Sequence, residues 1–258
     1  MCETGEAREY ILEVENLVRN YKMSDQEGET KEVKVLRGLS FTVEPHEFVG
    51  IMGRSGCGKT TLLKTLGMID RPTKGSVKFK GIATEKLVGD KLAAVRRNEL
   101  GFVFQDFYLM DSLSVRENIM LPMILNQEKV PKMKAAAERY AEQFGIAHLL
   151  EKNPYELSGG EKQRVAICRA LINDPSVILA DEPTGNLDSK SSQNVIESLV
   201  KINGEMGKTI LLVTHDPIVA SYCKKIIFLK DGEILETIEK EKERTAFYQR
   251  IIGKMAEL

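Results

Sequence analysis

The sequence predicts an α/β fold in which a helical subdomain interrupts a core of strands and helices. Short apolar runs with the length of buried strands occur within residues 10–52 and again from residue 176 onward. Residues 84–175 are instead mostly helical in pattern. No internal repeat or low-complexity linker divides the 258 residues, so the chain is expected to form a single domain.

The N-terminal part is expected to contain an antiparallel β region that leads into a buried strand. Polar and apolar residues alternate over residues 10–14 and 33–43, and the polar segment 24–32 between them is typical of a hairpin loop. The continuous apolar run 48–52 predicts a strand that is buried on both faces. A helix is expected over residues 59–69, because its leucines lie on one side.

The middle of the chain is expected to be helical after one strand-like segment, residues 101–104. Segments 114–121 and 132–144 are amphipathic, and prolines at 122, 131 and 154 punctuate the helices. We therefore assign residues 106–175 to the helical subdomain.

The α/β rhythm returns after residue 176. The pattern predicts a strand over 177–180, a helix over 189–202, a strand over 209–213, a short helix over 217–223, and a hairpin formed by 226–229 and 233–237. A Lys-Asp-Gly turn joins the two hairpin strands. Residues 9–105 and 176–238 are thus assigned to the β region and the core.

Residues 239–258 are expected to form a C-terminal amphipathic helix. Apolar residues recur there at helical spacing, at Phe247, Ile251 and Met255. This stripe either packs on its own domain or binds a partner protein.

Composition limits the classes of function. Lys and Arg total 37 and Asp and Glu total 38, which gives a formal net charge of −1 and argues against nucleic acid as a partner. No apolar run approaches the roughly 18 residues of a membrane-spanning helix, and residues 1–6 have no apolar signal segment. A separate subunit would therefore have to cross any membrane. The four cysteines, at 2, 57, 168 and 223, lack metal-site or disulfide spacing.

Residues 53–60 match the phosphate-binding P-loop pattern G-x-x-x-x-G-K-[ST] between a predicted strand and a predicted helix. The glycines let backbone N–H groups point at phosphates, and the helix dipole adds attraction. Lys59 supplies a point charge for the β- and γ-phosphates, and the Thr60 hydroxyl is a Mg²⁺ ligand. The sequence therefore predicts binding of ATP and Mg²⁺, with the nucleotide held by Gly53, Arg54, Ser55, Gly56, Cys57, Gly58, Lys59, Thr60 and Thr61.

Two carboxylates follow the apolar run 177–180. Asp181 is expected at the edge of the sheet beside the P-loop, where it can hold magnesium through water. Glu182 can point at the attacking water and act as general base. The pair alone could cap a helix, but its combination with the P-loop predicts ATP hydrolysis.

A second glycine-flanked turn lies in segment 157–164, Leu-Ser-Gly-Gly-Glu-Lys-Gln-Arg. It combines a hydroxyl with a predicted helix start, which makes a second anion-binding nest or simply a capped helix. One nucleotide on one P-loop has no obvious use for a second cradle.

That segment resembles the signature motif of ATP-binding cassette (ABC) ATPases, and the motif order fits this family over nearly the whole chain. The resemblance implies a P-loop NTPase cassette: a RecA-like mixed-sheet core, an N-terminal antiparallel β region and an inserted helical subdomain. In this family two cassettes meet head to tail. Ser158, Gly159 and Gly160 are therefore expected to close over ATP held by the P-loop of a second copy.

The resemblance assigns further roles residue by residue. Tyr21 matches the aromatic residue that stacks on adenine, although a core aromatic is its alternative. Gln105 matches the glutamine that senses magnesium and the γ-phosphate and faces the membrane subunit. Asp188 lies in the loop that crosses the dimer interface next to the nucleotide, and His215 matches the switch histidine near the γ-phosphate.

Within the family, segment 100–119 is similar to cassettes of macrolide exporters and lipoprotein-release machines. Segments 214–223 and 247–252 are similar to the bacitracin-resistance type. This resemblance implies a peptide-antibiotic resistance or export system. In it, a cytoplasmic ATPase sits at the inner face of the cell membrane and drives a multi-span permease.

Other hypotheses are less favoured by the sequence. Cassette ATPases of DNA repair or chromosome organisation carry long coiled coils or extra domains, and a mechanotransmission ATPase of the cell envelope would use the same motifs. A small-molecule kinase would leave the signature segment and His215 without a purpose.

Overall fold

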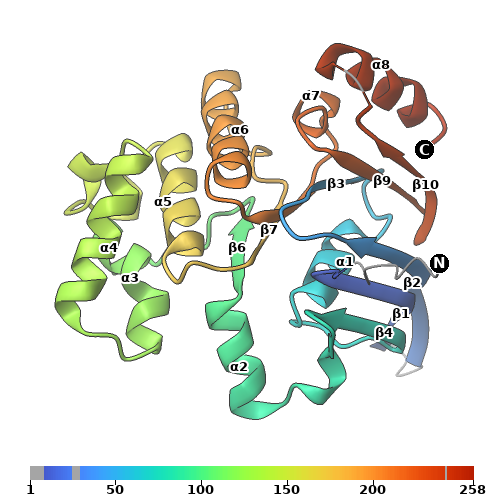
Figure 1. The fold of residues 1–258 in the computed structure, drawn as a ribbon, viewed down its shortest axis with the longest axis horizontal. Coiled ribbons are helices and arrows are strands. Elements are labelled where there is room, and N and C mark those ends of the chain that lie inside the picture. The colour runs from blue at the N-terminus through green and yellow to red at the C-terminus, as the bar shows by residue number, and fades with distance from the viewer. Residues whose placement is uncertain (1–8, 25–29, 242) are drawn as a thin grey trace, which may run out of the picture.

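A six-stranded sheet forms the centre of the chain in a computed structural model, which describes residues 9–24, 30–241 and 243–258 (Figure 1). Its strands are β3 (Phe48–Gly53), β6 (Leu100–Phe104), β7 (Val177–Asp181), β8 (Thr209–Val213), β9 (Lys225–Lys230) and β10 (Glu233–Glu239). Their order is β10-β9-β3-β8-β7-β6, parallel except for the edge strand β10. All residues of β3 and β8 are buried, as expected of parallel strands covered on both faces.

A second, antiparallel sheet has the strand order β2-β1-β4-β5. It contains β1 (Leu12–Ser24), β2 (Thr30–Val43), β4 (Lys74–Phe79) and β5 (Ile82–Ala83). The predicted hairpin is confirmed, and its strands run further than the alternating pattern indicated. Residues 25–29 of the predicted loop lie outside the described residues. The sequence pattern did not predict β4 and β5.

Three helices, α3 (Val115–Leu125), α4 (Val130–Gln143) and α5 (Gly159–Leu171), gather at the end of the molecule opposite the second sheet (Figure 1). The expected helix end at residue 121 is wrong, because α3 continues through Pro122 for another turn. Pro131, unlike Pro122, lies in the first turn of its helix, α4, where the missing N–H has no helical partner to lose.

The remaining helices connect or cover the strands. They are α1 (Lys59–Leu66), α2 (Gly89–Asn98), α6 (Ser189–Gly204), α7 (Pro217–Ala220) and α8 (Arg244–Met255), with short 3₁₀ turns at Thr84–Lys86, Ala147–Leu149 and Pro154–Glu156. The expected C-terminal helix starts later than predicted, because residues up to Glu239 still belong to β10.

Two apolar clusters fill the space on the two faces of the central sheet. Successive side chains of a strand point to opposite faces. In β3, Phe48 and Met52 therefore join the cluster under the helices, whereas Val49 and Ile51 join the cluster under the second sheet. The sheet is thus held from both sides, which fixes the end of β3 where residue 53 begins the P-loop.

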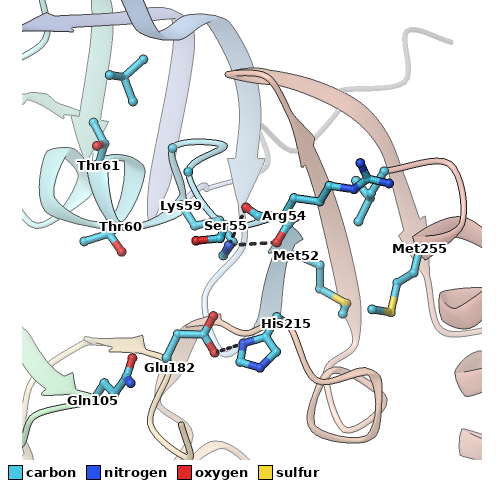
Figure 2. A pocket seen from close by; sticks show the side chains of 15 residues that line it. Met52, Arg54, Ser55, Lys59, Thr60, Thr61, Gln105, Glu182, His215 and Met255 are labelled. Atoms are coloured by element: carbon cyan, nitrogen blue, oxygen red, sulfur yellow. Dashed lines mark hydrogen bonds and ion pairs between the residues drawn. The ribbon is translucent and has the colours of Figure 1, made fainter. Parts of the chain in front are cut away.

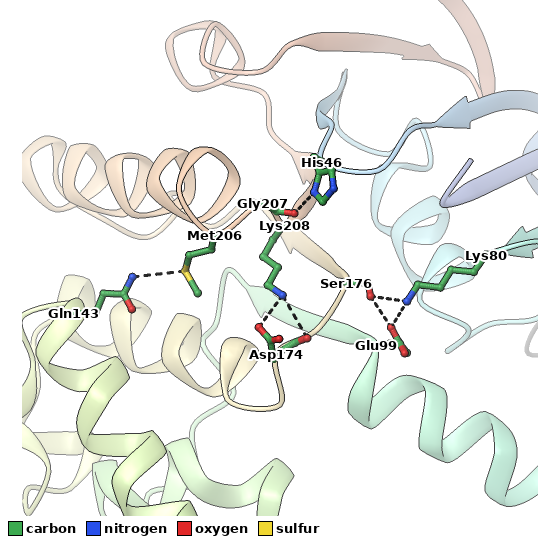
Figure 3. Close-up of polar contacts among 9 residues, drawn as sticks. All are labelled: His46, Lys80, Glu99, Gln143, Asp174, Ser176, Met206, Gly207 and Lys208. Atoms are coloured by element: carbon green, nitrogen blue, oxygen red, sulfur yellow. Dashed lines mark hydrogen bonds and ion pairs between the residues drawn. The ribbon is translucent and has the colours of Figure 1, made fainter. Parts of the chain in front are cut away.

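Polar contacts connect the layers at the opposite end of the parallel strands (Figure 3). Lys208, before β8, pairs with Asp174 before β7 at 2.7 Å. Lys80, after β4, pairs with Glu99 at 2.7 Å and also donates to the Ser176 hydroxyl. His46 Nδ1 donates to the carbonyl of Gly207. These contacts join the loops that precede the strands, away from the P-loop.

A buried asparagine holds the loop that precedes α3. The Asn118 side chain is fully buried, donates to the carbonyls of Met110, Leu113 and Ser114 at 3.0–3.1 Å, and accepts from the Met110 N–H at 2.8 Å. Replacing Asn118 by leucine would leave the Met110 N–H and the Leu113 carbonyl without partners, whereas the carbonyls of Met110 and Ser114 would each keep one backbone bond. We expect a loss of about 2–4 kcal/mol in the free energy of unfolding, measured by urea denaturation.

The matched control is Asn194→Leu, because Asn194 is exposed on α6. It should change the unfolding free energy by less than about 0.5 kcal/mol. Equal stability of the two variants would contradict the role given to Asn118.

Candidate functional site

The P-loop joins the buried end of β3 to the start of α1. Gly56 and Gly58 have φ values of 81° and 107°, in the left-handed region that suits glycine. Gly58 is also the N-cap of α1 and offers no side chain to cover the helix N-terminus. The first backbone N–H groups of α1 are therefore free to bind an anion.

A pocket of about 790 Å³ opens at this loop (Figure 2). It brings together parts of β2, the P-loop, the end of β7, the loop after β8 and the end of α8. Its lining residues are Val35, Met52, Gly53, Arg54, Ser55, Gly56, Gly58, Lys59, Thr60, Thr61, Gln105, Glu182, His215, Met255 and Leu258. Cys57 does not line it. The Cys57 side chain is buried, and burial raises the pKa of its thiol.

Lys59 is held inside the loop. Its Nζ donates to the carbonyls of Gly53 at 2.8 Å and Arg54 at 3.0 Å, and the side chain is buried. An ammonium group has three N–H donors, so one remains for a ligand. This fixed positive charge beside exposed helix N–H groups suits a polyphosphate.

Thr60 and Asp181 form an oxygen pair beside the P-loop. The Thr60 hydroxyl donates to Asp181 Oδ1 at 3.3 Å. Burial raises the pKa of Asp181, partly offset by that hydrogen bond, and the nearby charge of Glu182 raises it further. A bound hard cation would offset the cost of burying the ionised Asp181 carboxylate. One carboxylate and one hydroxyl suit Mg²⁺, because this ion keeps waters and phosphates as its other ligands. The two residues thus fit the predicted metal.

Glu182 and His215 face the same pocket from neighbouring strands (Figure 2). The Glu182 carboxylate accepts from His215 Nδ1 at 2.9 Å. Glu182 has φ of 46°, which is costly for a residue with a Cβ, and its N–H donates to the carbonyl of Val213 at 3.0 Å. The bend turns the side chain of Glu182 from the end of β7 into the pocket.

Gln105 lines the pocket from the end of β6. Its Nε2 donates to Asn186 Oδ1 at 3.0 Å, and the Asn186 amide donates to Asp106 at 3.1 Å. Asn186 therefore links the segment after β6 to the loop before α6, a connection that the sequence did not predict.

The signature residues lie outside this pocket. Ser158 is the N-cap of α5, and its hydroxyl and N–H both donate to the Glu161 carboxylate, which also lowers the pKa of Glu161. Asp188 caps α6 by accepting from the N–H groups of Lys190 and Ser191 at 3.0 Å. Gly159 lies beside Leu187 in the loop that carries Asp188, and Gly160 lies beside Ser191 in the first turn of α6. These residues form a second surface, and their binding to nucleotide stays a prediction.

Tyr21 also lies outside the pocket. Its hydroxyl donates to Asp70, and the Arg19 guanidinium lies over its ring at 4.4 Å from the centroid. Its stacking on adenine stays a prediction. Four apolar residues of the pocket, Val35, Met52, Met255 and Leu258, were not predicted from the sequence. An apolar pattern in a strand or helix does not indicate which distant loop that element contacts.

Comparison with known proteins places these features in a family. The model of the ABC transporter family matches residues 36–185. An uncharacterized ABC transporter ATP-binding protein, YvcR of Bacillus subtilis, is 46% identical over 96% of this chain and 95% of its own length. The bacitracin export ATP-binding protein BceA of Halalkalibacterium halodurans is 44% identical, over 94% of both chains.

A solved structure has the same fold. It is a post-hydrolysis dimer of the ATP-binding cassette MJ0796 of Methanocaldococcus jannaschii with ADP and Pi. The TM-score is 0.81 and the identity 38%, over 90% of this chain and all of the other. Among the described residues, no helix is both long and apolar enough to cross a membrane. The chain belongs to the ABC transporter ATP-binding family, whose members bind ATP and hydrolyse it to drive transport.

Proposed function

We propose that this chain is the Mg²⁺-dependent ATPase of a peptide-antibiotic resistance or export transporter. It would work as a head-to-tail dimer on the cytoplasmic side of the cell membrane, attached to a multi-span permease. The observation that carries the proposal is a divided site. The P-loop, Thr60 and Glu182 line one pocket, with Asp181 bonded to Thr60 beside it, while the signature residues 158–160 lie outside it.

We assign roles in hydrolysis to the P-loop, Lys59, Thr60, Glu182, His215 and Gln105 of the pocket and to Asp181 beside it. The P-loop N–H groups and Lys59 hold the phosphates, and bound Mg²⁺, carried by Thr60 and Asp181, would neutralise charge on them. Glu182 accepts a proton from the water that attacks the γ-phosphorus, and the bond to the β–γ bridging oxygen breaks to release ADP. The hydrogen bond from His215 orients the Glu182 carboxylate. Gln105 reaches the same pocket from β6.

A second copy would complete the site. The first turn of α5 presents the N–H groups of Gly159 and Gly160, which would bind a phosphate from outside the chain, and the Ser158 hydroxyl would join them on leaving its bond to Glu161. The structural relative MJ0796 is described as a dimer with ADP and Pi. We therefore infer that the α5 N-terminus of one copy covers the P-loop nucleotide of the other.

The permease would dock in an apolar groove next to Gln105. The groove has a volume of about 340 Å³ between the end of β6, α3 and α5. Phe102, Phe104, Leu121 and Leu125 line it, and Tyr108 and Leu125 are 63% and 59% exposed. Arg96 and Arg97 also line it. A short cytoplasmic helix of the permease with apolar and acidic residues would fit this groove, and bacitracin export by the relative BceA suggests the type of cargo.

Arg169 connects this groove to the signature helix. It lies on α5 and donates to the carbonyls of Phe107 and Tyr108, and burial lowers its pKa to about 10. Phe107 and Tyr108 both have left-handed φ values, of 60° and 47°. The segment after Gln105 is thus held in a strained form that can move with α5, which would carry motion from the ATP site to the permease.

Pull-down from native membranes tests the partnership. The chain should recover a multi-span permease, and Leu125→Glu should lower that recovery by roughly tenfold, because it puts a charge into an apolar interface. The ATPase activity of the isolated chain should not change. Val130→Glu is the matched control, since Val130 is 54% exposed at the start of α4 but does not line the groove.

Two outcomes would contradict the proposal. Recovery of DNA or of a soluble partner alone would rule out a transporter subunit. Equal permease recovery by Leu125→Glu and Val130→Glu would rule out the groove as the docking surface.

A further inference from the structure

Three side chains at the edge of the P-loop pocket form a chain of hydrogen bonds between two loops. Gln105 Nε2 donates to Asn186 Oδ1 at 3.0 Å, and Asn186 Nδ2 donates to Asp106 Oδ1 at 3.1 Å. Asn186 Nδ2 also lies 3.4 Å from the backbone carbonyl oxygen of Gln105. We call Asp106, Asn186 and Gln105 the amide relay. Of these three residues, Gln105 alone lines the pocket.

The order of donors and acceptors in the amide relay fixes which way each amide is turned. An ionised carboxylate only accepts hydrogen bonds, so the group of Asn186 beside Asp106 must be its NH₂. The side-chain oxygen of Asn186 is then left for Gln105, and this oxygen can only accept. Gln105 therefore has to turn its own NH₂ group toward Asn186, which leaves its Oε1 for the pocket.

This remaining oxygen lies on the side of the pocket where Mg²⁺ is expected. Strand β6 pairs with β7 in parallel, with Phe104 opposite Asp181, so Gln105 follows directly after the level of Asp181 on the neighbouring strand. Figure 2 shows the side-chain oxygen of Gln105 turned to the side of Thr60 and its nitrogen turned away. Mg²⁺ prefers oxygen ligands, whereas an amide NH₂ group is only a donor. The orientation of the Gln105 amide therefore matters for metal binding.

The turn that carries Asn186 packs tightly against the Gln105 amide. A Cβ at Gly185 would lie only 3.0 Å from Cδ and 3.1 Å from Nε2 of Gln105, so glycine at this position lets the amide come close. The Gly185 N–H donates to the carbonyl of Glu182 at 3.0 Å. One short turn thus carries Glu182 at its start and contacts the Gln105 amide at its end.

We propose that Asp106 and Asn186 are positioning residues that present Oε1 of Gln105 to Mg²⁺ in the nucleotide site. This inference rests on the proposed Mg²⁺-dependent function and on the role of Gln105 as a metal ligand. If the order of donors and acceptors were reversed, Gln105 would turn its NH₂ group toward the cation. The amide relay therefore determines whether Gln105 favours or opposes metal binding, although Asp106 and Asn186 do not line the pocket.

The first test separates metal binding from nucleotide binding. Asn186→Ala removes the amide relay and frees the Gln105 amide to rotate. In the presence of Mg²⁺, the affinity for AMP-PNP, a non-hydrolysable ATP analogue, should fall roughly fivefold, the size expected for the loss of an exposed hydrogen bond. With EDTA in place of Mg²⁺, the affinity should stay within about twofold of the parent chain, because the P-loop is unchanged. Calorimetry measures both affinities.

Two comparisons show whether Asn186 acts through Gln105. In a Gln105→Ala chain, the further change Asn186→Ala should alter the affinity in Mg²⁺ by less than about twofold, because the amide relay has no amide left to orient. Asn194→Ala is the matched control, since Asn194 is exposed on α6 and does not line the pocket. It should leave both affinities at the values of the parent chain.

Variants of Asp106 test the direction of the amide relay. Asp106→Glu keeps an acceptor and should retain the affinity in Mg²⁺ within about twofold. Asp106→Lys puts a donor there, so Asn186 would turn its oxygen to position 106 and its NH₂ group to Gln105. This variant should lose about as much affinity in Mg²⁺ as Asn186→Ala does, and the two changes together should lose no more. A direct effect of the lysine charge would instead persist in the combined variant.

Several results would overturn the inference. One is an unchanged affinity of Asn186→Ala in Mg²⁺, and another is an equal loss in Mg²⁺ and in EDTA, which would mean that Asn186 only supports the pocket. A full effect of Asn186→Ala in the Gln105→Ala chain, or of Asp106→Lys in the Asn186→Ala chain, would show a route other than the amide relay. If Mg²⁺ does not raise the affinity of the parent chain for AMP-PNP, the proposed Mg²⁺ dependence is itself wrong, and the inference falls with it.

Discussion

Replacing Glu182 by glutamine is expected to slow ATP hydrolysis by roughly 10²-fold or more, the usual size of a general-base contribution. Glutamine keeps the shape of the side chain and can still meet His215, but it cannot take a proton from water. The phosphate contacts of Lys59 and the P-loop are untouched, so ATP affinity should stay within about twofold of the parent chain. This variant is therefore expected to keep its affinity for ATP and to lose most of its ATP hydrolysis.

The same variant should accumulate as an ATP-bound dimer. ATP would bring two copies together, and hydrolysis would normally part them. Size-exclusion chromatography with and without ATP, alongside phosphate release, measures both effects. Glu205→Gln is the control, since Glu205 is exposed after α6 and away from the pocket. A monomer in the presence of ATP together with unchanged turnover would refute the base assignment.

Local sequence patterns predicted those elements of the fold whose structure depends on residues that are neighbours in the chain. A continuous apolar run predicted β3 because a parallel strand covered on both faces must be apolar along its length. The P-loop pattern predicted a turn between β3 and α1 because glycine is needed at the left-handed positions 56 and 58. The carboxylates after β7 and the histidine after β8 meet because neighbouring parallel strands end at one edge.

Other features depend on contacts between distant segments, which a local pattern does not contain. Helix α3 continues through Pro122 because packing against α4 and α5 overrides the local penalty. The left-handed turn at Glu182 is held by the carbonyl of Val213 on another strand. The apolar stripe of α8 was visible in the sequence, but its arrival at the P-loop depends on the β9–β10 hairpin.

Gly159→Asp should abolish ATP-driven dimer formation and lower hydrolysis by roughly a hundredfold. In the proposed dimer the new carboxylate faces the phosphates of the partner's ATP. Contact between like charges costs several kcal/mol, and about 3 kcal/mol is enough to slow hydrolysis a hundredfold. ATP binding to the single chain should be unchanged, because Gly159 does not line its pocket. Chromatography and phosphate release are again the measurements.

The fold should tolerate this change. The nearest atom to an added Cβ at Gly159 would be the flexible end of Leu187 at 3.0 Å, with Asn186 and Phe107 at ordinary contact distances of 3.7 and 4.0 Å. An acidic residue in the first turn of α5 also interacts favourably with the helix dipole. At Gly160, by contrast, a Cβ would come within 2.7 Å of Ser191. A substitution there would strain the structure, so a loss of activity could not be assigned to the dimer contact alone. Gly204→Asp, at a helical glycine with open space around it, is the matched control and should behave as the parent chain.

Mixing two inactive variants distinguishes a shared site from a self-contained one. A Lys59→Ala chain lacks the phosphate charge but keeps its signature, and a Gly159→Asp chain has the reverse defect. In a head-to-tail dimer of the two, one site combines the intact P-loop of the second chain with the intact signature of the first. The mixture should therefore hydrolyse ATP faster than the sum of the separate chains. If each chain completed its own site, every site in the mixture would carry a defect and no activity would return.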